Sequence, residues 1–437
     1  MDGFLHRHRE LYCEDVPVSA LAARYGTPLY VYSKGAFLAR LGELRDAFAE
    51  AKPLICYSVK ASGNLSLLRL MARAGAGFDV VSGGELFRVL KAGGKASKVV
   101  FAGVGKTERE IAEAVSVGIR AFNVESVQEL QAIDRAARRA RKRARALLRL
   151  NPDVDANTVA KTTTAKRENK FGIDLNRARD IFAGRRRFPS VDIEGVHLHL
   201  GSPMYTTAPF RRGLIKAARF IAEVRAMGAE ISTVNVGGGY CISYDGRKVI
   251  GPADYAAAIL PAIRKLGVRL ILEPGRYIAG NSGILLTKVT YVKRGWSNRT
   301  FVVLDAGMND LLRPAMYDAY HHIWPVKGPA SPVFGNGRPG RKPLQKVDIV
   351  GPICETSDCF AKGCRLPSVK SGDLIVVYSA GAYGMSMSST YNARPRPAEV
   401  LVSGKRYRLI RKHETYADLI RGEQDRPRIP AARGRKK

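Results

Sequence analysis

The sequence predicts an α/β protein: a closed (β/α)8 barrel of the TIM type, followed by an all-β C-terminal domain that the N-terminal segment joins. The barrel is predicted by short apolar runs that alternate with longer amphipathic segments between about residues 53 and 275, and by the number of those runs, eight. Strands that alternate with helices pair in parallel, and eight such units favour a closed ring over an open sheet. The second domain is predicted by strand-like runs, separated by Gly and Pro, that follow Arg276.

We expect each of the eight apolar runs to form one barrel strand. The runs are residues 54–60, 78–82, 98–102, 121–125, 146–151, 193–201, 234–237 and 270–273. The segments between them mostly carry the apolar spacing of amphipathic helices, as in residues 65–72 and 84–90. In such barrels the active site lies at the carboxyl ends of the strands.

After the barrel, the expected strands are residues 284–292, 301–305, 347–350, 374–379 and 399–409. The predicted organisation is an N-terminal segment that packs with the β domain, the barrel, the all-β domain, and a basic tail that we expect to be disordered. Their bounds are 1–32, 33–283, 284–420 and 421–437.

Charge is the unusual feature of the composition. The chain has 437 residues, with 72 Lys and Arg against 39 Asp and Glu, a net charge of +33. Such an excess attracts nucleic acid or anionic surfaces without a specific site. The basic clusters, at residues 135–143, 185–187 and 433–437, are typical of solvated helix faces, loops and tails. Because no zinc-finger, RNA-recognition or basic-zipper pattern accompanies them, we expect no specific nucleic-acid partner.

The same sequence predicts a cytoplasmic protein. Its first residues include an acid and lack an apolar core segment, so they do not resemble a secretory signal, and no apolar run has the length of a membrane span. Six cysteines in so long a chain do not form a disulfide scaffold, which favours a reducing compartment.

Residues suited to chemistry lie at the ends of the predicted barrel strands. Lys60 ends the first run, Asp79 lies in the second, and Glu273 ends the eighth, just before Arg276. A lysine at the end of a buried strand is costly unless it is neutral, paired or used covalently. An ion pair with a carboxylate is the structural alternative to a catalytic amine.

The sixth and seventh runs end in two further patterns. Residues 237–239 are three glycines, which either form a plain turn or let backbone N–H groups approach an anion, with Arg276 as a second ligand. His197 and His199 lie on one face of a strand. Three interpretations remain open: the two histidines bind a metal, stack on a flat cofactor, or are hydrogen-bonded core residues. The third ligand that a metal needs is not evident nearby in the sequence.

Three cysteines follow in the second domain. Cys354, Cys359 and Cys364 are spaced more widely than a zinc knuckle, and no fourth Cys or His follows closely, so we expect no metal. A single reactive thiol at Cys354, beside Glu355, is the favoured interpretation. Tyr383, in a loop of small residues after a strand, fits a structural role as well as a functional one.

Taken together, these segments resemble diaminopimelate decarboxylases, a family of fold-type-III pyridoxal-phosphate enzymes, over about residues 30–411. The segments that carry the resemblance are 56–61 (CYSVKA), 75–86, 168–173, 197–202 (HLHLGS), 273–276 (EPGR), 305–317, 351–355 and 391–397. The lysine, HxHxGS and EPGR motifs are shared with ornithine and arginine decarboxylases. The stretch MNDLLRPAMY, residues 308–317, is much more specific to the diaminopimelate enzymes.

The resemblance implies a role for each candidate residue. Lys60 would carry pyridoxal 5'-phosphate covalently, and Cys354 would donate the proton that replaces CO2. The implied cofactor-binding residues are Lys60, Asp79, His199, Ser202, Gly238, Gly239, Glu273, Gly275, Arg276 and Tyr383. The implied substrate-binding residues are Arg276, Arg313, Tyr317, Glu355 and Tyr383.

The resemblance also implies a reaction, the decarboxylation of meso-2,6-diaminopimelate to L-lysine and CO2, the last step of lysine biosynthesis. It implies a homodimer with shared active sites, because the cysteine-bearing loop of this family reaches into the partner's barrel. The alternatives are a decarboxylase of ornithine, arginine or carboxynorspermidine, and a non-catalytic protein that retains the barrel for binding.

Overall fold

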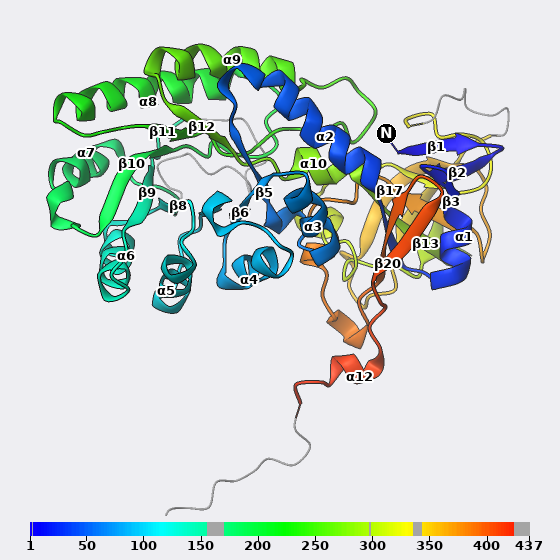
Figure 1. Cartoon of the computed structure of the whole chain (residues 1–437). Helices are drawn as coiled ribbons and strands as arrows, with labels where there is room; N and C mark the ends of the chain where they lie inside the picture. The colour runs from blue at the N-terminus through cyan, green and yellow to red at the C-terminus, as the bar shows by residue number, and fades with distance from the viewer. Residues whose placement is uncertain (2, 155–169, 297–298, 335–342, 424–437) are drawn as a thin grey trace, which may run out of the picture.

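The computed structural model describes residues 1, 3–154, 170–296, 299–334 and 343–423. Residues 168 and 169 of one family motif, and residues 424–437 of the predicted disordered tail, lie outside the described residues. The described chain forms a barrel surrounded by helices and, beside it, a domain built on a mixed sheet, as Figure 1 shows.

Eight parallel strands close the barrel, in the order β10-β11-β12-β5-β6-β7-β8-β9. The ring closes where the last strand pairs with the first, with Ile271 opposite Leu54 and Leu272 opposite Ile55. The predicted (β/α)8 barrel is confirmed, and each apolar run overlaps one strand. The strands are β5 (Leu54–Ser58), β6 (Gly77–Val80), β7 (Val99–Phe101), β8 (Ala121–Val124), β9 (Ala144–Arg149), β10 (Val191–His197), β11 (Thr233–Asn235) and β12 (Arg269–Leu272).

Helices follow the barrel strands and surround them (Figure 1). Many begin at a side chain that accepts a hydrogen bond from the first turn, as Asn64, Ser82, Thr107 and Ser126 do, so the sequence itself fixes where each strand gives way to a helix. The helices are α2 (Lys34–Ala47), α3 (Leu65–Arg73), α4 (Gly83–Lys91), α5 (Glu108–Val117), α6 (Val127–Arg139), α7 (Leu175–Ala183), α8 (Ala208–Ala226), α9 (Pro252–Leu266) and α10 (Arg276–Ala279).

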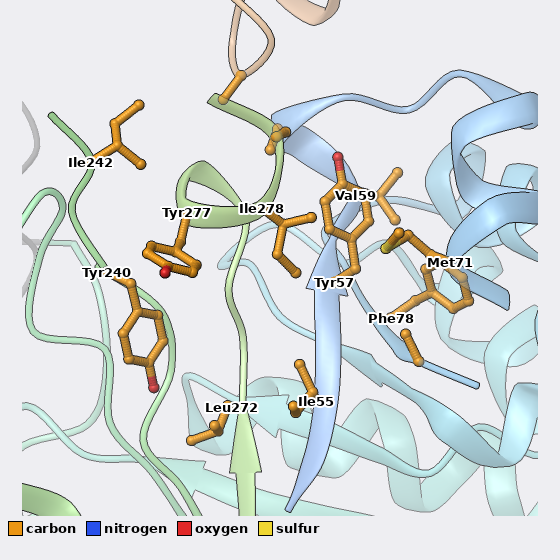
Figure 2. Packing of buried hydrophobic residues seen from close by; sticks show 14 of the residues in the cluster. Ile55, Tyr57, Val59, Met71, Phe78, Tyr240, Ile242, Leu272, Tyr277 and Ile278 are labelled. Carbon is orange, nitrogen blue, oxygen red and sulfur yellow. The ribbon is translucent and has the colours of Figure 1, made fainter. Parts of the chain in front are cut away.

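Alternation along the first barrel strand divides its side chains between two environments. Ile55, Tyr57 and Val59 are buried and belong to the main core, in the region that Figure 2 shows with Met71 and Phe78. Cys56 belongs to a separate small cluster with residues of β7, β8, β9 and β12, which is the interior of the barrel. Because side chains alternate along a strand, Ser58 also faces the interior, at the carboxyl end of the ring.

The second domain is a mixed sheet in the order β17-β16-β14-β13-β4-β19-β20, with β18 paired to β13 and β15 to β18. Its strand β4 (Leu29–Ser33) comes from the N-terminal segment, which joins this domain as the sequence predicted, and lies between β13 and β19. The other strands are β13 (Gly283–Arg294), β14 (Thr300–Leu304), β15 (Ile323–Pro325), β16 (Gln345–Val350), β17 (Cys359–Leu366), β18 (Leu374–Val377), β19 (Ala398–Ser403) and β20 (Arg406–Arg411).

Smaller elements complete the described chain. A three-stranded sheet and one helix precede β4: β1 (Phe4–Arg7), β2 (Glu10–Cys13), β3 (Val16–Pro17) and α1 (Val18–Tyr25). Two short helices, α11 (Arg313–Tyr317) and α12 (Tyr416–Leu419), interrupt the otherwise β-structured C-terminal part. Among the described residues, none of the helices combines the length and the apolar character that a bilayer crossing requires.

Sequence reasoning missed details of the second domain. The predicted run 399–409 is two antiparallel strands, β19 and β20, with Gly404 in the turn between them at a positive φ of 57°. Strands β15 and β17 were not predicted. The first has three residues, and the second, CFAKGCRL, mixes polar and apolar residues because only parts of it are buried.

One buried carboxylate connects the two domains. Glu399 of β19 is 1% exposed and accepts hydrogen bonds from the Tyr32 hydroxyl of β4 at 2.9 Å and from Asn64, the residue that caps α3, at 2.7 Å. Nε of Arg411 in β20 lies 2.6 Å from the same carboxylate. Each of these partners would lose its acceptor if the carboxylate were removed.

We therefore predict that Glu399→Ala lowers the free energy of unfolding by about 3 kcal/mol, because it leaves buried donors and a guanidinium unpaired. The measurement is chemical unfolding followed by circular dichroism. Glu50→Ala is the matched control: Glu50 pairs with Arg264 where both side chains are more than half exposed, so its loss should cost less than about 1 kcal/mol. Equal effects of the two substitutions would contradict the prediction.

Candidate active site

A cavity of about 860 Å³ opens at the carboxyl end of the barrel. Its lining includes side chains from the barrel and from the second domain. Of the residues singled out from the sequence, the cavity is lined by Lys60, His199, Ser202, Arg276, Arg313, Tyr317 and Tyr383. The structure therefore brings together residues that are up to 323 positions apart in the chain (383 minus 60).

Lys60 follows β5 and is paired with a buried carboxylate. Its Nζ lies 2.5 Å from Oδ2 of Asp79 on β6, and Ser58 Oγ donates to the same oxygen at 2.6 Å. Burial alone would lower the pKa of the Lys60 ammonium, but the adjacent Asp79 carboxylate outweighs burial and raises that pKa above its ordinary value. In the described state Lys60 is a protonated amine held in place by Asp79.

Glu273 follows β12 and is held deep in the barrel by three side chains. Its Oε1 accepts hydrogen bonds from Asn235 of β11 at 2.6 Å and from Asn123 of β8 at 2.8 Å, and Oε2 lies 3.2 Å from Nε2 of His197. Burial alone would raise the pKa of this carboxyl group, but His197 holds it well below its usual range. Glu273 is thus an ionised carboxylate in a site closed to water.

The two histidines of the HxH motif differ in environment. His197 is buried against Glu273, whereas His199 lines the cavity. Burial and the nearby Arg149 lower the pKa of His199 well below its ordinary value, so its ring is neutral. The third ligand that the sequence did not reveal is Glu273: nitrogens of both histidines and an oxygen of Glu273 lie within 4.8 Å of one another. Because Glu273 already contacts His197 and two amides, we favour a hydrogen-bonded cluster over a metal site.

Glycines let the strand ends approach one another. A Cβ on Gly238 would collide with the carbonyl oxygen of Glu273, and one on Gly239, whose φ is +98°, with that of Gly201. A Cβ on Gly275 would come within 2.9 Å of Cβ of Ser58. Gly238 and Gly239 are required by the close approach of backbone to backbone, and Gly275 by the Ser58 side chain, whether or not they also face an anion.

Arg276 lies in the cavity wall at the start of α10. Its Nε donates to Ser202 Oγ at 3.3 Å, and its guanidinium lies 5.0 Å from the centre of the Tyr383 ring. Tyr383 has a positive φ of 57°, and its N–H donates to the carbonyl of Ala61 at 2.8 Å, which ties this loop to the residue after Lys60.

Arg313, at the start of α11, faces Arg276 across one tyrosine. The hydroxyl of Tyr244 accepts hydrogen bonds from Nη1 of Arg276 at 2.6 Å and from Nη1 of Arg313 at 2.9 Å. Among the described residues, neither guanidinium has a carboxylate within ion-pair distance. One wall of the cavity therefore carries two guanidiniums that no carboxylate of the described residues pairs with.

Cys354 and Glu355 are not part of this cavity. Both are exposed, the N–H of Cys354 donates to Asn392, and the Tyr391 hydroxyl donates to the carboxylate of Glu355. Within one chain, the structure does not bring these two predicted residues to Lys60.

Sequence reasoning missed several residues that the site uses, namely Ser58, Asn123, Asn235, Tyr244 and His321. Ser58 had a usable signal, because it precedes Lys60 by two positions in the same predicted run, where alternate residues share one side. Asn123 and Asn235 had a weaker signal, since each is a polar residue within an apolar run. Tyr244 and His321 lie in loops, where no periodicity indicates direction.

Comparisons with known proteins agree with this geometry. Residues 34–280 match the family model described as the pyridoxal binding domain of pyridoxal-dependent decarboxylases. The chain is 45% identical over 413 residues to the diaminopimelate decarboxylase of Neisseria meningitidis serogroup A, covering 94% of this chain and 98% of that protein. It is 43% identical over 420 residues to the diaminopimelate decarboxylase of Haemophilus influenzae, covering 96% and 98%.

Solved structures give the same result. The diaminopimelate decarboxylase of Helicobacter pylori complexed with L-lysine is 38% identical, with a TM-score of 0.86 and coverage of 92% of this chain and 98% of that one. The enzyme of M. jannaschii in complex with L-lysine is 37% identical, with a TM-score of 0.90 and coverage of 97% and 98%. With its barrel, its strand-end lysine and these relatives, the chain belongs to the pyridoxal-dependent decarboxylase family, which includes the diaminopimelate decarboxylases.

Proposed function

We propose that this protein decarboxylates meso-2,6-diaminopimelate to L-lysine and CO2, with pyridoxal 5'-phosphate held on Lys60. The observation that carries the proposal is a pair of arginines, Arg276 and Arg313, that have no carboxylate partner among the described residues and lie in the same cavity as the strand-end lysine. The names of the most similar relatives support the same substrate.

The residues of the cavity fit this cofactor. Lys60 offers the amine, His199 a neutral flat ring, and Ser202 a hydroxyl suited to a phosphate. Within the described part of the chain, Oδ1 of Asp79 and Nδ1 of His197 are buried without a hydrogen-bond partner, so polar capacity remains unused at this site. When bound, pyridoxal phosphate supplies a ring that accepts the electrons left on Cα after CO2 departs.

The chain's own groups have separate tasks in this reaction. Glu273, held ionised by His197 and two amides, would keep a proton on the pyridine nitrogen. Asp79, which contacts the Lys60 ammonium at 2.5 Å, would hold that amine in place and protonated until the cofactor arrives. Tyr383 would cover the cofactor beside Arg276.

Arg276 and Arg313, with Tyr317 beside them in the cavity wall, would bind the carboxylate at the end of the substrate that does not react. A guanidinium matches a carboxylate in two hydrogen bonds, which an ammonium does not. A substrate without that carboxylate leaves both cations unpaired. The expected selectivity against such a substrate is on the order of 10⁴-fold. The two arginines therefore favour diaminopimelate over ornithine.

Cys354 and Glu355 would act in the active site of a partner subunit, as proton donor and as the acceptor for the remote ammonium. Their exposure, and their absence from the cavity of their own chain, support a homodimer in which each cavity is completed by the other chain. We also propose a cytoplasmic location, supported by the fact that all six cysteines are free.

The proposed reaction predicts rapid release of CO2 from meso-diaminopimelate by the purified, cofactor-loaded protein, at least about 10³-fold faster in kcat/KM than from ornithine or arginine. Lys60→Ala should abolish both the visible absorbance of lysine-bound pyridoxal phosphate and the reaction. Higher activity on ornithine or arginine would replace the proposed substrate, and wild-type protein that never acquires the absorbance band would favour the non-catalytic alternative.

The proposed shared active site predicts complementation between inactive variants. Lys60→Ala and Cys354→Ala should each have very low activity alone, whereas an equimolar mixture, unfolded and refolded together, should recover about a quarter of wild-type activity. Each variant refolded by itself is the control. If the mixture stays as inactive as its components, each cavity uses the cysteine of its own chain.

The Lys60–Asp79 pair predicts a pH effect. An amine whose pKa is raised stays protonated over a wider pH range, so Asp79→Asn, which removes the carboxylate and leaves the burial, should lower the pKa of Lys60 and with it the pH at which Lys60 captures free pyridoxal phosphate. The measurement is the pH dependence of the capture rate by stopped-flow absorbance. Asp192→Asn, which breaks an exposed ion pair with Arg143 remote from the cavity, should leave it unchanged. An unshifted midpoint in Asp79→Asn would remove Asp79 from this role.

A further inference from the structure

Tyr244 occupies an unusual position between two cations. It follows the glycine-rich stretch by five residues (244 minus 239), and its hydroxyl oxygen accepts from both Arg276 and Arg313, at 2.6 and 2.9 Å. The Arg313 guanidinium also lies 5.0 Å from the centre of the Tyr244 ring. One side chain therefore fixes the distance between two guanidiniums that come from different domains of the chain.

His321 holds Arg313 from the other side. Nη1 of Arg313 donates to Nε2 of His321 at 3.1 Å, and Nδ1 of His321 donates to the carbonyl of Tyr378 at 2.9 Å. This pattern requires the tautomer with its proton on Nδ1. Burial and Arg313 lower the pKa of His321 to about 3, so the ring stays neutral and adds no third charge. The imidazole also packs edge-on against Tyr244, 5.4 Å between ring centres.

Two buried guanidiniums near one another repel, and their loss of water is costly unless acceptors surround them. Tyr244 supplies one acceptor to both. Although burial alone would raise the pKa of the phenol, Arg276 and Arg313 lower it below its ordinary value. The tyrosine thus keeps the two cations side by side and leaves other guanidinium N–H groups available as donors. A carboxylate requires this arrangement.

We propose that Tyr244 is a specificity-determining positioning residue, which sets the spacing of Arg276 and Arg313 so that together they select ligands with a carboxylate remote from the reacting carbon. The inference rests on the proposed function and deepens it. Tyr244 acts through the two arginines and takes no part in bond breaking.

The chemistry of the reaction supplies a probe of the remote end. Diaminopimelate loses one carboxylate as CO2, and the product L-lysine keeps the other, at the end that does not react. Cadaverine, which is L-lysine without that carboxylate, offers the same amines and chain. The ratio of the two affinities therefore reports the carboxylate contact alone.

The test is calorimetric titration of the cofactor-loaded wild-type protein and Tyr244→Phe with L-lysine and with cadaverine. Tyr244→Phe should weaken L-lysine binding about 10- to 100-fold, the usual range for a lost hydrogen bond to a charged group, and leave cadaverine binding within about threefold. KM for meso-diaminopimelate should rise in parallel while kcat changes less than about threefold. Tyr240→Phe is the matched control, because that buried hydroxyl has no hydrogen-bond partner among the described residues and its ring packs on Phe210 and Tyr255.

Tyr244→Glu is the second variant, and it keeps the test valid if the phenylalanine variant is unstable. A glutamate would give both guanidiniums a charged acceptor, so the protein should unfold at or above the wild-type temperature and yet bind L-lysine more weakly than Tyr244→Phe does. Unchanged L-lysine affinity in either variant, an equal loss for cadaverine, or a fall confined to kcat would overturn the proposal. Failure of the wild-type protein to decarboxylate diaminopimelate would instead refute the proposed function, because the binding ratio is measured without turnover.

Discussion

Closure of the barrel is the constraint on which the site depends. Only because β12 pairs with β5 does the first strand end beside the last, so that Ser58 Oγ lies 3.1 Å from the carbonyl oxygen of Glu273. Lys60 and Glu273, 213 positions apart (273 minus 60), then occupy adjacent sectors of one ring. An open sheet would place the same two strands at opposite edges, and neither the amine nor the carboxylate would have its present neighbours.

The electrostatics of the cavity follow from this arrangement. Negative charge lies inside the barrel, on Asp79 and Glu273, where amides, a hydroxyl and His197 satisfy it. Positive charge lies in the outer wall, on Arg276 and Arg313, where a phenol is the shared partner. A ligand with a cationic ring toward the interior and an anionic end toward the second domain meets opposite charge at both places, which favours one orientation over its reverse.

Much of this could be predicted from the sequence because it is recorded locally. The eight strands are continuous apolar runs, and parallel strands expose their terminal residues at one end of a barrel, so Lys60 and Glu273 were predictable. Contacts set by barrel closure and by loops could not be predicted. Examples are the cluster of Glu273 with His197 and His199, and the position of Tyr244 between two arginines. Both depend on strand register and on irregular backbone. Strand β17 was missed because an edge strand with exposed polar residues has no clear pattern.

The place of β4 in the sheet has a consequence for how the chain is made. Residues 29–33 leave the ribosome early, but one neighbour, β13, follows some 250 positions later (283 minus 33), and the other, β19, later still. Until those segments emerge, β4 has two unpaired edges, and Tyr32, which is buried in the finished sheet, lacks its carboxylate acceptor. Synthesis therefore completes the barrel before the sheet, and a chain that stops short of residue 398 retains a nascent strand open to pairing with other molecules.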